Sequence, residues 1–163
     1  MSNSSIYGIR NYRFEDADKA ASIRGTTSEL DRERFEEIVI SDKDWSGHYR
    51  HFAIHKNGEV IGDIQLRRCQ QTMPPGVAHV GIDILESARG QGAGTSALEL
   101  VWEWAKSENF HRLEGSTDVL NIAMRKAFEK AGWEFEGILK SLFCGDGIAH
   151  DYSSYAKTIS IKL

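Results

Sequence analysis

Cysteine is scarce in this chain, and its sequence contains no long apolar run. The two cysteines, Cys69 and Cys144, lie far apart and form no CxxC pair, so neither a disulfide scaffold nor a cysteine zinc site is expected. No stretch approaches the roughly 20 apolar residues that span a bilayer. Residues 1–5 lack the basic and apolar segments of a signal peptide. We therefore expect a cytoplasmic protein with no membrane partner.

An excess of positive charge is also missing. The 163 residues carry a net charge of −4 at pH 7, and the pI is near 5.9, which argues against nucleic acid as the main partner. Because 40% of the residues are hydrophobic and 27% are charged, the composition is that of an ordinary globular domain. We predict a single domain over residues 1–163, with a flexible tail at residues 1–5.

The most informative segment is the glycine-rich stretch Arg-Gly-Gln-Gly-Ala-Gly at residues 89–94. Before it, residues 77–85 alternate apolar and polar side chains as a strand does, and from Thr95 the apolar residues recur with helical period. A glycine turn between a strand and a helix leaves backbone N–H groups unpaired at the positive end of the helix dipole. Such a turn suits a phosphate group, and Arg89 adds a cation at its mouth.

The spacing of the glycines excludes two common phosphate loops. No Lys-Ser/Thr pair follows Gly94, so the nucleoside-triphosphate loop is absent. Gly90, Gly92 and Gly94 alternate, whereas a dinucleotide fingerprint requires the spacing GxGxxG. An ordinary strand-to-helix turn remains the alternative interpretation.

The rest of the chain predicts alternating strands and helices. Asn57-Gly58 between two apolar runs is a strong hairpin signal, and Ser28 is a plausible N-cap for the second helix. Strands are expected at residues 6–12, 51–55, 59–67, 77–85, 112–116, 134–143 and 149–161, and helices at 15–24, 29–40, 95–108 and 122–131. Residues 41–49 are expected to form a loop. This order predicts a mixed α/β fold with a sheet of six or seven strands.

In the order of its expected strands and helices, and in its glycine-rich stretch, the chain resembles the GNAT acetyltransferases. Residues 89–94 match the family pattern Arg/Gln-x-x-Gly-x-Gly/Ala, which in that family holds the pyrophosphate of acetyl-CoA. Similarity to the ribosomal-protein N-acetyltransferase branch comes from residues 110–114, Asn121, residues 129–137 and the late Asp151-x-x-x-Tyr155. The resemblance implies a mostly antiparallel sheet of six to seven strands, flanked by about four helices.

The resemblance also implies a set of cofactor-binding residues for acetyl-CoA and no metal. The pyrophosphate site would comprise Arg89, Gly90, Gln91, Gly92, Ala93, Gly94 and Thr95. The pantetheine arm would pair with the main chain of Ile82 and Ile84, whose side chains would belong to the core. Asn121 would bond the pantetheine arm, cap the helix that begins at Ile122, or do both. Arg125 and Lys130 either reach CoA phosphates or lie on a solvated helix face.

His79 is the candidate general base. Strand alternation points it away from Val80 and Ile82 and places it on the same side as Asp83. The wider family often has a carboxylate at this position, and an imidazole titrates near neutral pH. The alternative is an ordinary sheet histidine. His48, His51 and His55 predict no metal site, because neither a carboxylate nor a cysteine completes their spacing.

The proton donor is where this sequence departs from the family. Many GNAT enzymes have a Tyr in the fourth helix where this chain has Phe128, and the ribosomal branch often has a Ser where this chain has Met124. The proton that these missing hydroxyls would donate must come from another group. We take Tyr155 as the candidate donor, and the alternatives are Tyr152, Ser141 and water. Cys144 is expected to be a buried structural thiol.

The acceptor pocket is expected between the first two helices, the loop at residues 41–49 and the closing hairpin. Glu29, Glu33 and Glu37 share one helix face, which either attracts a cationic amine or is a plain exposed face. Trp45 is either a lid or a core residue. The sub-branch resemblance implies a protein or peptide amine as the acceptor. We expect direct acetyl transfer, because no Ser or Cys is spaced with a His and a third group as an acyl-enzyme nucleophile would be. The alternatives are a small-molecule amine, and a non-catalytic acetyl-CoA sensor. Many relatives dimerise, so a homodimer is possible.

Overall fold

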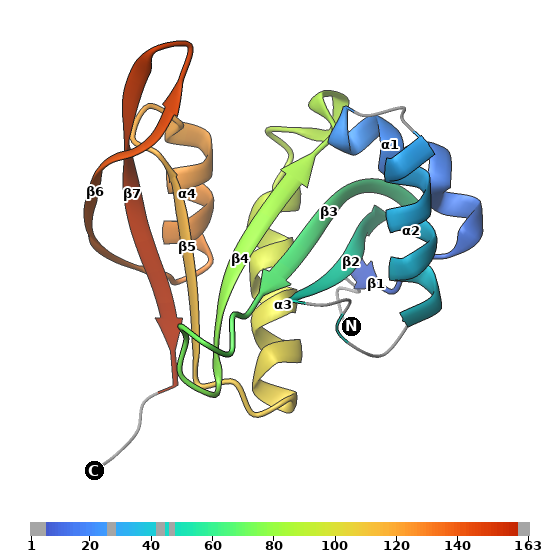
Figure 1. Ribbon diagram of the computed structural model, residues 1–163, viewed down its shortest axis with the longest axis horizontal. Helices are drawn as coiled ribbons and strands as arrows, with labels where there is room; N and C mark the ends of the chain where they lie inside the picture. Colours follow the sequence, from blue (N-terminus) through green and yellow to red (C-terminus); the bar gives the residue numbers. More distant parts are fainter. Residues whose placement is uncertain (1–5, 26–28, 42–44, 46–47, 160–163) are drawn as a thin grey trace.

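The computed structural model describes residues 6–25, 29–41, 45 and 48–159. Within these residues seven strands form one sheet (Figure 1). The strands are β1 (Tyr7–Arg10), β2 (Tyr49–Lys56), β3 (Glu59–Arg67), β4 (Val77–Ile84), β5 (Arg112–Asp118), β6 (Glu134–Gly145) and β7 (Ile148–Thr158). The helices are α1 (Ala17–Arg24), α2 (Glu29–Ser41), α3 (Ala93–Ser107) and α4 (Ile122–Lys130), and short 3₁₀ turns occur at η1 (Phe14–Asp16) and η2 (Glu86–Ala88).

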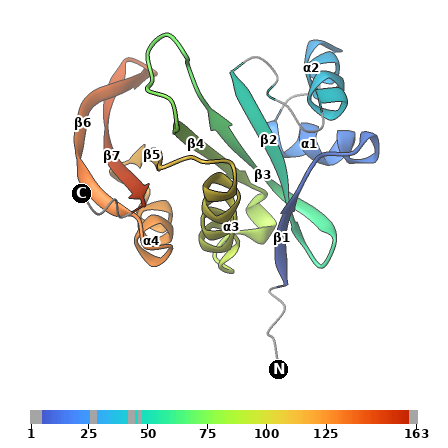
Figure 2. The same cartoon turned by 90° about the horizontal axis from the view of Figure 1, so that it is seen from below.

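The strand order is β1-β2-β3-β4-β5-β7-β6. Every neighbouring pair is antiparallel except β4 and β5, which are parallel. Helices α3 and α4 cover one face of the sheet, and α1 and α2 lie on the other face beside β2 and β3 (Figure 2). The expected mixed, mostly antiparallel sheet with four flanking helices is confirmed.

The main core lies between the sheet and α3. The predicted apolar stripe of α3 is fully buried, and it packs against inward side chains such as Ile64 and Leu66 of β3. The stripe consists of Ala97, Leu98, Val101 and Ala105. A second core cluster, which includes Phe35 and Val39 of α2, lies under α1 and α2. Burial of these side chains is the main stabilising contribution to both layers.

Several element boundaries differ from those expected. α3 begins at Ala93 instead of Thr95, because Gly92 takes the N-cap position with φ of 90°. β1 ends at Arg10 instead of Tyr12, because Tyr12 leaves the sheet and is buried in the second cluster. The hairpin at Asn57-Gly58 is confirmed, with positive φ at both residues. The expected N-cap Ser28 lies outside the described residues.

Helix α4 is packed onto the sheet through Phe128, whose buried ring lies over Gly115 of β5. A Cβ added at Gly115 would lie 2.6 Å from the Phe128 Cζ atom. We expect Gly115→Ala to lower the free energy of unfolding by about 1–3 kcal/mol, because the ring and α4 must shift. Urea denaturation measures this change.

Gly94→Ala is the matched control. Its Cβ would have ordinary contacts, at 3.6 Å from Ile84 and 3.7 Å from Ala127, so no loss of stability is expected in a helical turn. If Gly115→Ala proved as stable as the wild type, the close packing of α4 on β5 would be disproved.

Candidate functional site

Strands β4 and β5 are hydrogen-bonded over only part of their length. Residues 77–80 pair with residues 112–115. In the described part of the chain, residues 81–84 and 116–118 do not pair with each other, and the strands separate toward the top of Figure 1. β3 continues to hold β4 up to Ile84, and β7 holds β5 up to Asp118. The sheet therefore splits after the row of Val80 and Gly115.

The main chain of Ile82 and Ile84 faces this split. Leu85 N–H donates to Ile61 O at 2.9 Å, which continues the β3–β4 register. Because alternate residues of an antiparallel strand direct their N–H and C=O groups to the same partner, Asp83 faces β3, and Ile82 and Ile84 face the split. Their side chains pack against the main core, as expected. Backbone donors and acceptors therefore stand at the split without a strand partner.

The glycine loop lies where β4 leads into α3. Gly90 and Gly92 have φ of 71° and 90°, and an added Cβ at either position would meet no atom within 4 Å. These glycines are needed for their backbone conformation and for the open space above them. Ser96 N–H makes the first helical bond, to Gly92 O at 3.0 Å. The N–H groups of residues 93–95 consequently have no acceptor within the helix, the arrangement that binds anions.

Side chains fix the conformation of the loop. Arg89 Nε donates to Ile84 O at 2.9 Å, which leaves its terminal nitrogens available at the loop mouth. The predicted residues Ile82, Ile84 and 89–95 therefore come together at one end of the split. Asn121 Oδ1 accepts the Met124 N–H at 3.1 Å, so its role as a cap of α4 is confirmed. Its contact with a cofactor stays a prediction.

His79 lies where β4 and β5 are still paired, one residue before the split begins. Its cross-strand neighbours are Arg67 on β3 and Glu114 on β5. Ala78 and Val80 point into the core under α3, so His79 occupies the opposite face. Burial and the nearby Arg67 lower its pKa below the ordinary value of 6.5, while Glu114 acts in the opposite direction. The imidazole is therefore neutral at neutral pH, the form that a general base requires.

Two carboxylates of β5 lie on the same face of the sheet as His79. Leu113 and Thr117 of β5 are buried toward α4, so the alternating Glu114 and Asp118 point to the face of His79. His150 Nδ1 lies 2.8 Å from an Asp118 carboxylate oxygen. Sequence reasoning missed Glu114 and Asp118. The alternation of β5 signals their shared face, but only the parallel register with β4 places Glu114 beside His79.

A buried carboxylate, that of Asp63 on β3, lies on this face of the sheet beneath α1. Asp63 is only 2% exposed; it accepts the Tyr12 hydroxyl at 2.9 Å and lies 3.2 Å from His51 Nδ1. Burial and the charge of Asp63 raise the pKa of Tyr12 well above its ordinary value. Asp63 also stands opposite Asp83, and partial burial together with the charge of Asp63 raises the pKa of the Asp83 carboxyl. Asp63 and Asp83 therefore place two carboxylates side by side on this face, with the Arg24 guanidinium 3.7 Å from Asp63.

Tyr155 lies on the other side of the sheet. Its side chain is fully buried, its ring stacks on Phe128 at 4.9 Å, and its hydroxyl donates to Glu129 at 3.2 Å. It pairs with Gly115, in the last row before the split. The structure therefore does not bring Tyr155 and His79 together, because they occupy opposite faces.

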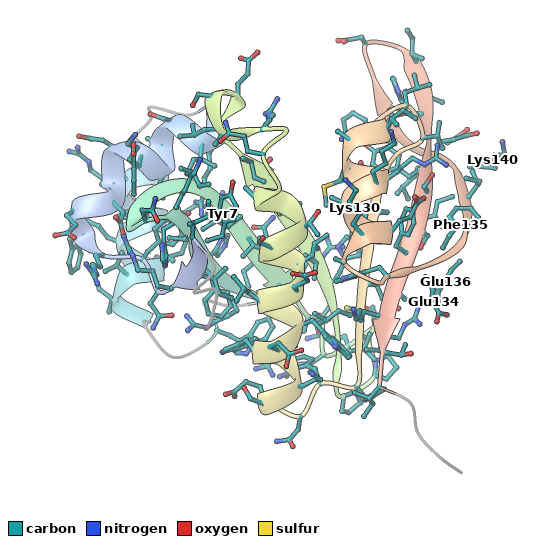
Figure 3. All side chains as sticks on the ribbon, turned by 180° about the vertical axis from the view of Figure 1, so that it is seen from behind. Tyr7, Lys130, Glu134, Phe135, Glu136 and Lys140 are labelled. Atoms are coloured by element: carbon teal, nitrogen blue, oxygen red, sulfur yellow. The ribbon has the colours of Figure 1, made fainter. Side chains whose placement is uncertain are left out.

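The expectation that Cys144 is buried is wrong. Its thiol is exposed, as are most side chains of the edge strand β6, among them Lys140 (Figure 3). Ser141, another candidate donor, lies in an irregular part of β6, where its N–H bonds Asp151 at 2.9 Å.

Other expectations can also be placed. Trp45 packs on Phe110, with ring centroids 6.0 Å apart, and Arg68 lies over its ring, so the core interpretation holds. Glu33 and Glu37 of α2 are exposed, and the side chain of Glu29 lies outside the described residues.

Two absences apply only to the residues that the structure describes. No group of His, Cys, Asp and Glu side chains among them is arranged to hold a metal ion. None of the described helices has the length and apolar character needed to cross a membrane.

Comparison with known proteins gives the family. A model of the acetyltransferase (GNAT) domain matches residues 9–134. Among curated proteins, none matches the sequence. The fold is similar to that of ribosomal-protein-S5-alanine acetyltransferase from Vibrio fischeri, at 19% identity over 96% of this chain and 95% of that one, with a TM-score of 0.79.

Two further structures are similar and contain CoA. The first is Mycobacterium smegmatis RimJ in complex with CoA-disulfide, at 22% identity over 93% of this chain and 81% of that one, with a TM-score of 0.76. The second is RimL, a ribosomal L7/L12 alpha-N-protein acetyltransferase in complex with coenzyme A, at 18% identity over 97% of both chains, with a TM-score of 0.79. At these identities the structures show a shared fold, and the matched domain covers most of the sequence. The chain belongs to the GNAT acetyltransferases.

Proposed function

We propose that this protein transfers the acetyl group of acetyl-CoA directly to a primary amine, in a ternary complex built on one domain. The observation that carries this proposal is the split between β4 and β5, with the main chain of Ile82 and Ile84 facing into it. The CoA complexes of RimJ and RimL support it. The pyrophosphate would bind the free N–H groups of residues 93–95 and the Arg89 guanidinium. The pantetheine arm would pair with Ile82 and Ile84, and Asn121 would contact it.

The amine would reach the split from the face of His79, because α3 and α4 cover the other face. Asp83, Glu114 and Asp118 favour a cationic acceptor on that side. His79, held neutral by burial, would take the proton that the attacking ammonium must lose, directly or through water. Backbone N–H groups at the split would stabilise the oxyanion without adding net charge.

The departing thiolate has two sources for its proton. Tyr155 lies in the last row before the split, with Glu129 bonded to its hydroxyl, but the side chain is fully buried. Water is the competing source, because a thiol pKa near about 8.5 lets the thiolate leave without a strong acid. Full burial of Tyr155 favours water.

The proposed acceptor is an N-terminal or other primary amine of a protein or peptide. The similar structures from Vibrio fischeri and of RimL are named as acetyltransferases of ribosomal proteins, which supports this class. Acetyl-CoA turnover, followed as free thiol release against peptides of varied N-termini, polyamines and aminoglycosides, tests it. Release with peptides is expected. Release only with a small amine would change the acceptor class, and acetyl-CoA binding with no release would indicate a sensor.

Gly92→Val should remove measurable CoA binding. The new side chain would enter the open space above the loop, and a branched residue is strained at φ of 90°. Titration calorimetry with CoA measures the effect. Gly25→Val is the matched control, because Gly25 has φ of 68°, equally open surroundings and a place at the end of α1. If Gly92→Val bound CoA as the wild type does, the phosphate site would lie elsewhere.

His79→Gln should lower kcat/KM by about a hundredfold to ten-thousandfold, the usual contribution of a general base. The wild-type kcat/KM should fall as the pH drops through the pKa of His79, and this limb lies below 6.5 because the pKa is lowered. The variant should lose the limb. His55→Gln is the control, since the pKa of His55 on β2 is also lowered by burial. A pH profile that His79→Gln leaves unchanged would eliminate His79 as the base.

Tyr155→Phe separates the two proton sources. Loss of the bond to Glu129 should lower the free energy of unfolding by about 1 kcal/mol. If water protonates the thiolate, kcat should stay within tenfold of the wild type across the pH range. A larger fall in kcat, together with loss of an alkaline limb, would establish the Tyr155 hydroxyl as the donor. Tyr152→Phe makes the same test of the second candidate tyrosine, which pairs with Asp118 on β5.

A further inference from the structure

Two residues of β1 and β2, at one end of the sheet, reach the glycine loop from far away in the sequence. Tyr7 of β1 and Lys56 of β2 are direct cross-strand neighbours, and the Lys56 ammonium lies 5.9 Å from the centroid of the Tyr7 ring. The Tyr7 ring packs against the main core, on the α3 side of the sheet (Figure 3). The pair therefore stands beside the N-terminal end of α3, where the loop lies.

Both residues bond Gln91, the residue between Gly90 and Gly92. The Tyr7 hydroxyl donates to Gln91 O at 2.8 Å, and Lys56 Nζ donates to Gln91 Oε1 at 2.8 Å. The Gln91 side chain in turn donates from Nε2 to Ser87 O at 3.1 Å. Gln91 is thus held through its main chain and through both atoms of its side-chain amide.

These contacts matter because, beyond the bonds of Arg89, the two glycines of the loop have no side chains to hold it. Gly90 and Gly92 have no side chain, and no atom lies within 4 Å of either Cβ position. Glycine also has the largest backbone freedom to lose when it becomes ordered. A loop that is already ordered before its ligand arrives avoids that cost on binding.

We propose that Tyr7 and Lys56 are positioning residues that hold the loop at residues 89–92 in its anion-binding conformation through Gln91, and so increase the affinity for CoA. This inference rests on the proposed function, because it assumes that the loop binds the CoA pyrophosphate. The N-terminal strand thereby takes part in cofactor binding without touching the cofactor. Lys56 has a second conceivable role, since an ammonium beside the loop could contact a phosphate itself, and the experiment distinguishes the two.

The test is CoA affinity by titration calorimetry for Tyr7→Phe, Lys56→Met, Gln91→Ala and the double variant Lys56→Met/Gln91→Ala. Each single substitution should raise the Kd for CoA roughly three- to tenfold, the worth of one hydrogen bond. The double variant should bind no more weakly than Gln91→Ala alone, because Lys56 acts through Gln91. Additive effects of the two substitutions would overturn this route and make Lys56 a direct phosphate contact.

Amide hydrogen exchange of the loop, measured without CoA, provides the second readout. Tyr7→Phe should speed exchange of the loop amides while leaving the melting temperature unchanged. Lys19→Met is the control, since Lys19 forms an exposed pair with Glu59, outside the loop contacts. An unchanged Kd for CoA and unchanged exchange in both Tyr7→Phe and Lys56→Met would overturn the proposal. Failure of the wild type to bind CoA would instead overturn the proposed function, while faster exchange in Tyr7→Phe would still show that Tyr7 orders the loop.

Discussion

Backbone N–H and C=O groups inside a sheet need partners, and the parting of β4 from β5 leaves some without a neighbouring strand. Pairing stops at Val80 and Gly115, while β3 and β7 hold the two strands firmly on their outer sides. A sheet that opens in its middle invites an extended ligand with amide groups to fill the gap. The rest of the site is arranged around this opening. The loop before α3 lies at its wide end, and His79 lies next to the row where the two strands begin to separate.

The two faces of the split have different chemistry. α3 and α4 cover one face with apolar side chains, and Phe128 and Trp133 fill the space over Gly115. The other face carries His79, Glu114 and the carboxylate pair Asp63 and Asp83, partly covered by α1. Under the proposed function, this division would let the cofactor and the amine acceptor approach the same opening from different directions. It also keeps His79 neutral, because burial and Arg67 both oppose its protonation.

Much of this protein could be predicted from its sequence, because the relevant signals are local. The glycine loop and the hairpin at Asn57-Gly58 depend on φ values that neighbouring residues set, and the buried stripe of α3 follows from helical period. The alternation of β4 separated the side chain of His79 from those of Val80 and Ile82. These signals, with the family resemblance, were enough to predict the fold and to single out Ile82, Ile84 and residues 89–95, which lie at one end of the split.

Tertiary structure decided what depends on register and on the edges of the sheet. Tyr155 was the expected proton donor. Its ring stacks on Phe128 of α4, however, which places it on the face of the sheet opposite His79. Cys144 is exposed because it lies in the outer half of β6, where side chains on both faces of the strand are exposed. Glu114 joins His79 only through a parallel register, and Tyr7 and Lys56 reach Gln91 only once β1 lies beside α3. The sequence by itself determined the loop and the strand that carry the site, because their conformations are local. Which distant side chains meet there was decided by long-range packing.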